Sequence, residues 1–161
     1  MKFYFDAMGY PHTPEATDVV SWRIAGYALI IVAKKLLVVT PGWDKQYQLP
    51  GGSVGMEETL TEAIIRECYE ETGYTIARLS HRPIHVSESN FYHTVKKRFF
   101  HSLSLFYEAE LVNEIQDKRV VNSTAHTGEI SAIDWRLLHE LDETNCSAYA
   151  FQAIKALKLK L

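Results

Sequence analysis

The feature that most constrains this chain is a helical pattern inside the segment LPGGSVGMEETLTEAIIRECYEETGY, residues 49–74. Leu60, Ile64 and Cys68 recur at the i, i+4 spacing of a single helical face. The spacing predicts a helix over residues 58–72. The other elements of the chain are expected to surround this helix.

Glycine-containing turns bound the predicted helix on both sides. Gly73 stands where a left-handed C-terminal cap belongs. On the N-terminal side, Pro50-Gly51-Gly52 is a breaker cluster that neither a strand nor a helix is expected to continue through. Because glycine tolerates unusual dihedral angles and has no side chain, Gly51 and Gly52 can bring bare backbone close to a ligand.

Three carboxylates crowd the C-terminal half of the predicted helix. Glu67, Glu70 and Glu71 fall within an arc of roughly 100° at the border of the apolar face. Repulsion between such neighbours costs a few tenths of a kcal/mol per pair, and acids near a helix C-terminus oppose the macrodipole at ~0.3–1 kcal/mol each. A bound divalent cation is the simplest compensation for clustered hard oxygen ligands. The alternative is a solvated acidic surface, which is common on helices.

Other charged residues of the helix favour the cation interpretation. Arg66 can pair with Glu62 or Glu70 at a spacing of four residues. Glu58 lies two turns earlier, where it can reach Arg66 and fix that side chain.

At this point the segment resembles a known motif. Gly52, Glu58 and the run RECYEETGY at residues 66–74 resemble the Nudix box of the MutT-like Nudix hydrolases. The resemblance implies an α/β/α sandwich around a central mixed β-sheet, and Mg²⁺- or Mn²⁺-dependent hydrolysis of a nucleoside diphosphate linked to another moiety. Cys68, Tyr74, Gly55 and Glu57 depart from the residues common at their positions, so fine specificity does not transfer.

The resemblance also assigns roles by position. It implies metal ligands on the helix and the glycine turn, namely Glu67, Glu70, Glu71 and the Gly51 carbonyl, with Glu58 and Arg66 as a supporting pair. Our first choice for the general base that takes a proton from water is Glu70. The second choice is Glu129, which as readily reads as an additional metal ligand or a solvent-facing loop acid.

Candidate substrate contacts outside the motif are weaker. Lys96 and Arg98 alternate on a predicted strand and can face substrate phosphates, although a solvated strand edge is the simpler interpretation. Tyr92 lies near the place where diadenosine polyphosphate hydrolases of the family carry a base-stacking tyrosine. Trp43 and Tyr47 either stack on a base or pack inside the protein.

The rest of the chain reads mostly as strands. Alternation and breaker residues predict a hairpin of two strands, at residues 26–33 and 36–40, whose turn is carried by lysines. They also predict a short strand at 45–49 and two long strands, at 74–89 and 94–111, that are joined near Asn90. A further strand is predicted at 129–135 and a closing amphipathic helix at 147–159. Residues 112–127 are predicted to be a loop. Residues 1–16 look like an irregular lead-in, and their aromatic residues either pair with a second copy in a homodimer or cover a sheet edge.

Composition narrows the class of protein. The 161 residues suit one domain spanning 1–161, and 47% hydrophobic with 23% charged residues is ordinary for a globular chain. A net charge of −3 argues against a general nucleic-acid or membrane-surface binder. Cys68 and Cys146 lack metal-ligand spacing and read as reduced thiols. With no signal-peptide pattern and no apolar run of membrane length, we predict a soluble, cytoplasmic protein.

The predicted activity is therefore pyrophosphate hydrolysis on a nucleotide-derived small molecule, first of all a nucleoside triphosphate, oxidised forms included, giving the monophosphate and pyrophosphate. Dinucleoside polyphosphates, ADP-ribose and nucleotide sugars stay open as substrates. The competing class is a Nudix-fold sensor that binds a nucleotide without hydrolysing it. Such sensors usually lose carboxylates of the motif, and this chain keeps them.

Overall fold

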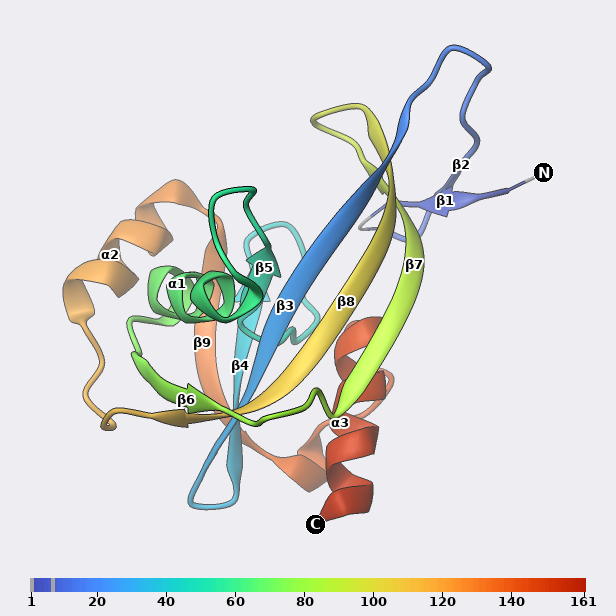
Figure 1. The fold of residues 1–161 in the computed structure, drawn as a ribbon. Coiled ribbons are helices and arrows are strands. Elements are labelled where there is room, and N and C mark those ends of the chain that lie inside the picture. The colour runs from blue at the N-terminus through green and yellow to red at the C-terminus, as the bar shows by residue number, and fades with distance from the viewer. Residues whose placement is uncertain (1, 7) are drawn as a thin grey trace.

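The computed structural model describes residues 2–6 and 8–161, and within them the chain forms a curled mixed sheet with helices on both faces (Figure 1). The strands are β1 (Tyr4–Phe5), β2 (Pro11–His12), β3 (Val20–Val32), β4 (Lys35–Pro41), β5 (Gly51–Ser53), β6 (Ile76–Leu79), β7 (His85–His93), β8 (Arg98–Leu111) and β9 (Ile130–Leu137). The helices are α1 (Leu60–Thr72), α2 (Lys118–Thr127), the 3₁₀ turn η1 (Leu138–Glu140) and α3 (Ala148–Lys160).

The sheet is built around the long parallel pair of β3 and β8. The strand order is β2-β1-β7-β8-β3-β4-β9, with β5 pairing with β3 and β6 with β8. The β3–β8 and β1–β7 pairs are parallel and the other pairs are antiparallel. The predicted mixed sheet is thus confirmed.

Alternation along β3 distributes its side chains between two cores. Tyr27 and Leu29 point toward α3 and join a cluster that includes Ile154. Ala28 and Ile30, one residue out of step, join a second cluster with residues of α1. With α1 on one face of the sheet and α3 on the other (Figure 1), the α/β/α sandwich predicted from the resemblance is confirmed.

The ends of α1 follow from its sequence. Thr59 is the N-cap, and its hydroxyl and the Glu62 carboxylate form a reciprocal capping box. Gly73 closes the helix in the left-handed conformation with φ 72°, as predicted. The helix starts two residues later than expected because Thr59 is extended, which leaves Glu58 in the preceding turn.

The prediction that no strand continues through Pro50-Gly51-Gly52 is wrong. Strands β3 and β4 pair only beside their turn, at Ile31–Leu36 and Val32–Lys35, and then separate. Residues 51–53 lie in the gap between β3 and β4 and form β5, which pairs with residues 25–27 of β3. Only isolated bridges form in the short strand expected at residues 45–49, because that segment is shared between β4 and the chain before α3. The β3–β4 turn consists of Ala33 and Lys34, one residue earlier than expected.

Three further expectations are corrected. The predicted loop at 112–127 contains α2, which begins at the N-cap Asp117. The long strand expected at 74–89 is divided into β6 and β7, with Pro83 in the interruption, and β7 runs past Asn90 to His93. The lead-in is partly ordered as β1 and β2, and β1 pairs with β7 of the same chain. No helix in the described ranges has the length and apolar character needed to cross a bilayer.

Candidate active site

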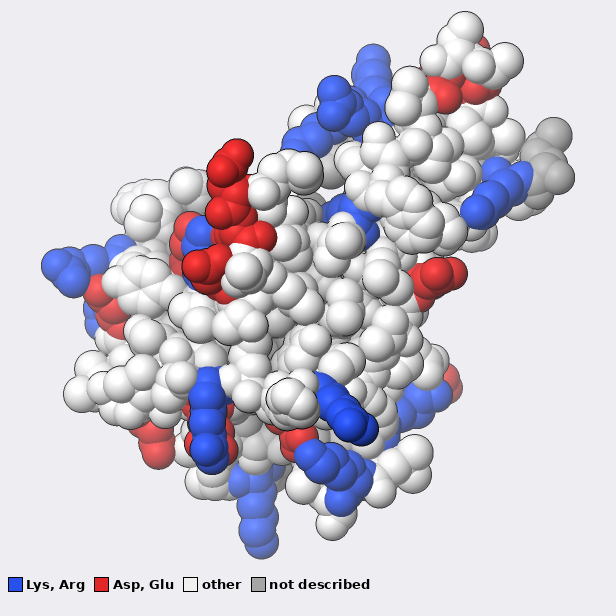
Figure 2. Space-filling view, in the orientation of Figure 1, with Lys and Arg blue, Asp and Glu red and all other residues white. Residues whose placement is uncertain are grey.

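The acidic residues of α1 gather where that helix meets β5. Figure 2 shows the resulting acidic patch over α1 and the neighbouring β5 turn. At its centre the Arg66 guanidinium donates to both carboxylate oxygens of Glu58, at 2.9 and 2.6 Å, and to Glu67 and Glu70 at 2.9 and 3.1 Å. Arg66 also donates to the Ser53 carbonyl at 3.3 Å. This side chain therefore ties the helix to the β5 turn.

The Glu58–Arg66 pair is held in its charged form. Hydrogen bonds from Arg66 and from the Gly55 amide lower the pKa of Glu58 to about 2, and the same Glu58 contact raises the pKa of Arg66. The predicted pairing of Glu58 with Arg66 is present, as is the contact with Glu70. Glu62, the other partner considered for Arg66, is used by the capping box instead.

Gly52 leaves room for the Glu67 carboxylate. A β-carbon added at Gly52 would lie 2.7 Å from Cδ and 2.8 Å from Oε1 of Glu67. At Gly51 the constraint is different, because φ is 147° and an added β-carbon would lie 2.2 Å from the Gly26 carbonyl oxygen. Gly51 is thus required by the backbone, and Gly52 by the position of the Glu67 side chain.

Glu71 is the most perturbed carboxylate of the patch. It is half-buried, and its Oε2 accepts a hydrogen bond from the Gly51 amide at 2.9 Å. Desolvation raises its pKa to about 8, although the Gly51 hydrogen bond opposes this, and the negative charges of Glu67, Glu129 and Glu70 add to the rise. These charges show that Glu129 lies close enough to act on Glu71, although the two are far apart in the sequence.

Helix α2, which the sequence did not predict, secures the C-terminal end of α1. The Thr124 hydroxyl donates to the carbonyl of Glu70 at 2.7 Å, and the Tyr69 hydroxyl donates to Asp117 at 2.9 Å. After its left-handed cap the chain passes Glu129, whose carbonyl accepts from the Gly42 amide. Helix α2 therefore both holds α1 in place and delivers Glu129 to the acidic patch.

The patch suits a hard divalent cation in chemistry, and its side chains need to reorient to bind one. All the available donors are carboxylate or carbonyl oxygens, which Mg²⁺ prefers. Within the described residues, no three His, Cys, Asp or Glu side chains converge as a ready ligand set. Glu67 and Glu70 instead face Arg66, and Glu71 faces an amide. Carboxylates that repel one another are expected to bind such hydrogen-bond donors. A bound cation would relieve the repulsion among the three carboxylates.

The predicted substrate residues lie elsewhere. Tyr92 stacks on His12 at 4.1 Å, and Lys96 and Arg98 are exposed around the β7–β8 turn. Tyr47 packs against the α3-side core, under the guanidinium of Arg136 at 5.2 Å. None of these four residues lines the cavity described next.

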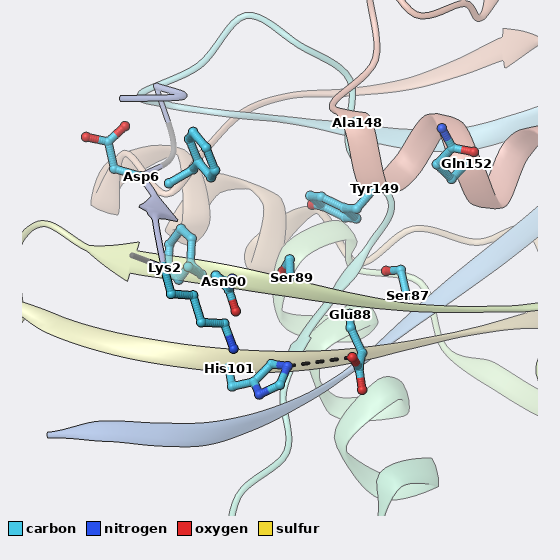
Figure 3. Close-up of a pocket in the computed structure, with 12 residues that line it drawn as sticks. Lys2, Asp6, Ser87, Glu88, Ser89, Asn90, His101, Ala148, Tyr149 and Gln152 are labelled. Carbon is cyan, nitrogen blue, oxygen red and sulfur yellow. Dashed lines mark ion pairs between the residues drawn. The ribbon is translucent and has the colours of Figure 1, made fainter. Parts of the chain in front are cut away.

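A cavity of about 480 Å³ adjoins the acidic patch on the α3 side of the sheet. Its lining includes Arg23 and Tyr27, which contact the β5 turn, and also Trp43, Ser102 and Tyr149. Of these, only Trp43 is among the candidate residues proposed from the sequence. The available signal was the alternation of serine with leucine in SLSL at residues 102–105, which gives β8 one small polar face. A wider hollow of about 740 Å³ lies between β7, the N-terminal segment and α3, away from the acidic patch (Figure 3).

Comparison with known families decides the identity of this arrangement. The family model of the NUDIX domain matches residues 21–157, which span β3 to α3 and include the whole acidic patch. The chain belongs to the Nudix family. This family comprises hydrolases of the pyrophosphatase type and is typically dependent on divalent metal ions, so the resemblance noted in the sequence is confirmed.

Solved structures agree with this fold. A MutT Nudix hydrolase from Burkholderia pseudomallei is 20% identical with a TM-score of 0.65, covering 84% of this chain and 97% of that one. An ADP-ribose pyrophosphatase from Streptococcus suis is 16% identical with a TM-score of 0.55, covering 84% and 91%. A UDP-X diphosphatase is 16% identical with a TM-score of 0.58, covering 92% and 67%. A search of curated proteins gave no match. Likeness at these identities concerns the fold of this Nudix protein and leaves its substrate open.

Proposed function

We propose that this protein is a Mg²⁺- or Mn²⁺-dependent pyrophosphohydrolase of nucleotide-derived substrates, with nucleoside triphosphates, oxidised ones included, as the first class to test. One observation chiefly supports the proposal. Glu67, Glu70 and Glu71 lie together on α1 against the Gly51-Gly52 turn, with Arg66 bound to Glu58 at their centre. A solvated acidic face would need neither the glycine that makes room for Glu67 nor the four-partner arginine.

Different residues of the proposed site have different roles in hydrolysis. A bound Mg²⁺ supplies charge neutralisation on the bridging phosphates and lowers the pKa of the attacking water. In the proposed site Glu67, Glu70 and Glu71, with the Gly51 carbonyl, would hold the cation. Arg66 with Glu58 keeps α1 and the β5 turn in register. The water oxygen bonds to phosphorus as the bond to the bridging oxygen breaks, and the water proton passes to a carboxylate.

Glu70 is the first candidate for that carboxylate, because it is the most exposed of the three and, within the described residues, its carboxylate hydrogen-bonds only to Arg66. Glu129 is the second candidate, since it approaches the patch from the loop after α2. Replacing the base by glutamine is expected to lower kcat by about 10²- to 10⁴-fold. Full activity in Glu70→Gln together with loss in Glu129→Gln would transfer the role to Glu129.

The test is a substrate panel in the presence of Mg²⁺. It contains nucleoside triphosphates, oxidised guanine nucleotides and dinucleoside polyphosphates, together with ADP-ribose and nucleotide sugars, which the names of two structural neighbours recommend. Coupling to inorganic pyrophosphatase detects released pyrophosphate, and coupling to alkaline phosphatase detects new phosphomonoesters. The matched control is Glu62→Gln, an acid of the same helix whose capping box accepts glutamine.

Metal-dependent turnover of at least one substrate, lost in Glu70→Gln or Glu129→Gln and kept in Glu62→Gln, is the expected result. No metal-dependent turnover on any substrate refutes the proposal. A ligand that raises the melting temperature and stays intact with Mg²⁺ would instead assign the protein to the sensor class.

A further inference from the structure

The start of β3 carries its apolar side chains on a side of the sheet that the described chain leaves open. Ile30 of this strand packs with residues of α1, and alternation places the other even-numbered residues of β3 on the same side. Val20, Trp22 and Ile24 lie before the part of β3 that α1 covers, and they are 42, 65 and 47% exposed. Arg23, between them, points to the α3 side, where it lines the 480 Å³ cavity. The usual order of a strand with one side in water, apolar inside and polar outside, is therefore reversed here.

The neighbouring strands extend this open apolar side. Leu103 and Leu105 of β8 are in register with even-numbered residues of β3 and lie half-buried on the open side, whereas Ser102 and Ser104 are buried on the α3 side. Val86 of β7 is opposite Leu105 and is 48% exposed. We call this surface the β3–β8 face, and its apolar residues are Val20, Trp22, Ile24, Val86, Leu103 and Leu105. Apolar side chains on the open side of three neighbouring strands indicate a face that a further layer covers.

Trp22 is the largest side chain of the β3–β8 face. Its indole stacks on the ring of His101, with 4.2 Å between the ring centroids and 15° between the ring planes. The stacking holds the indole in one orientation while most of its surface stays open to solvent. Figure 2 shows a largely uncharged surface over β3 and β8, between the acidic patch and the β7–β8 turn. A fixed, exposed tryptophan in an apolar surface is typical of the centre of a protein–protein interface.

The two ends of the β3–β8 face carry opposite charges. At one end Val20 pairs with Phe99, and the β7–β8 turn beside them is basic. The exposed cations of this turn are Lys96, Lys97 and Arg98. At the other end the Val54 amide donates to the Ile24 carbonyl at 2.9 Å, which fixes the turn between β5 and α1 beside the face. That turn presents an exposed carboxylate at Glu57 and leads into the acidic patch. The face is thus basic at one end, apolar in the middle and acidic at the other end.

We propose that a second copy of this chain covers the β3–β8 face, in a two-fold dimer in which the β3 strands of the two copies run antiparallel. In a two-fold interface the same surface of each copy meets itself, so apolar centre meets apolar centre. The antiparallel arrangement then brings the basic turn of each copy over the acidic turn of the other. Sheets stack about 10 Å apart, close to the diameter of a helix, so the second sheet fills the layer that α1 occupies further along β3. An anionic membrane or a nucleic acid suits the basic turn but is repelled by the acidic end, which favours a second copy.

The first experiment measures self-association by sedimentation velocity, at micromolar to submillimolar concentrations of the intact protein. We expect a reversible monomer–dimer equilibrium in the wild type. Trp22→Ser should raise its dissociation constant at least about 100-fold, because the symmetry of the dimer removes two indoles from one interface. The matched control is Trp43→Ser, which removes a tryptophan of similar exposure, 58%, that lines the cavity on the α3 side and should leave the equilibrium unchanged. Both side chains are exposed, so circular dichroism of the two monomers should match that of the wild type.

A charge exchange tests the orientation of the two copies. Glu57→Lys makes both ends of the face basic, and Lys96→Glu makes the basic end less so and places a carboxylate opposite the acidic turn. Each variant alone should dimerise at least about tenfold more weakly than the wild type, because like charges then meet across the interface. An equimolar mixture of the two variants should recover dimerisation, since each contact in the mixed dimer again joins opposite charges. The recovery requires the antiparallel arrangement and does not occur if the basic turns meet each other.

Several outcomes would overturn the proposal. A wild-type protein that stays monomeric at every concentration refutes it, as does a dimer that Trp22→Ser leaves intact. A dimer that Trp22→Ser weakens but that the mixture of charge variants does not recover refutes the antiparallel arrangement. Sedimentation of the monomer with phosphatidylserine vesicles, lost in Trp22→Ser, would assign the face to a membrane instead. None of these measurements involves hydrolysis, so they stand or fall separately from the proposed function.

Discussion

Glu71 makes the stability of the metal-free protein depend on pH in a way that can be calculated. Its pKa in the folded protein is about 8, against 4.5 for an unperturbed glutamate, because burial and neighbouring carboxylates disfavour its charge. The folded state therefore holds a proton that the unfolded chain has released. The resulting stabilisation is complete below pH 4.5 and is lost as pH rises through 8.

The size of the effect follows from the two pKa values. Between pH 6 and pH 8 the linkage relation gives a fall of about 2 kcal/mol in the free energy of unfolding, out of a ceiling of about 5 kcal/mol over the whole window. Glu71→Gln removes the titration, and its amide oxygen can still accept from the Gly51 amide. The variant should thus become more stable relative to the wild type as pH rises.

Urea unfolding in EDTA at pH 6, 7 and 8 measures this difference. Groups remote from Glu71 are the same in both proteins, so the wild-type-minus-variant difference reports on Glu71 and the carboxylates that act on it. Saturating Mg²⁺ should abolish the wild-type slope, because a cation favours the carboxylate and releases its proton. Parallel pH profiles of the two proteins in EDTA would refute the placement of Glu71 in a buried acidic cluster.

Two other predictions concern the support of the acidic patch. Gly52→Ala should fold, because the added methyl group meets the flexible end of Glu67, but it should reduce metal-dependent turnover at least tenfold by displacing that carboxylate. Gly51→Ala should instead give little soluble protein, because the added methyl group meets backbone atoms. Equal behaviour of the two variants would contradict this distinction. Arg66→Lys keeps the positive charge but loses the two guanidinium N–H groups that bind both oxygens of Glu58. Activity should therefore fall about 10- to 100-fold, while circular dichroism shows that the secondary structure is retained. Wild-type activity in this variant would remove Arg66 from the mechanism.

The chemistry of α1 could be predicted from the sequence because its determinants are local. The i, i+4 apolar residues, the Gly73 cap and the crowded glutamates all lie within one short segment. Even the Arg66–Glu58 pair joins two residues that are close together in the sequence. Local spacing therefore located most of the candidate site without any knowledge of the sheet.

Helix α2 and strand β5 could not be predicted in the same way. The α2 sequence KRVVNSTAHT is rich in weak helix formers, and its helix is supported by tertiary contacts such as Thr124 with the Glu70 carbonyl. Strand β5 forms only because β3 and β4 diverge and leave an edge for it. In both cases the deciding partner lies far away in the sequence.

The cavity illustrates the same limit for function. Arg23, Ser102 and Ser89 belong to three strands, and only the register of those strands brings them into one row. The tyrosine and the basic residues proposed from sequence, Tyr92, Lys96 and Arg98, lie at the far end of the β7–β8 hairpin because β7 continues to His93. The lining of this cavity is thus a property of strand pairing, which a single sequence does not reveal.

The central claim is that the acidic face of α1 is a divalent cation site. Electron paramagnetic resonance of free Mn²⁺, titrated with the wild-type protein and with Glu67→Gln, tests it without any assumption about substrate. The wild type should bind Mn²⁺ saturably, and Glu67→Gln should weaken that binding at least tenfold while Glu62→Gln leaves it unchanged. Absence of wild-type binding up to millimolar Mn²⁺, or equal binding by Glu67→Gln, would contradict the claim.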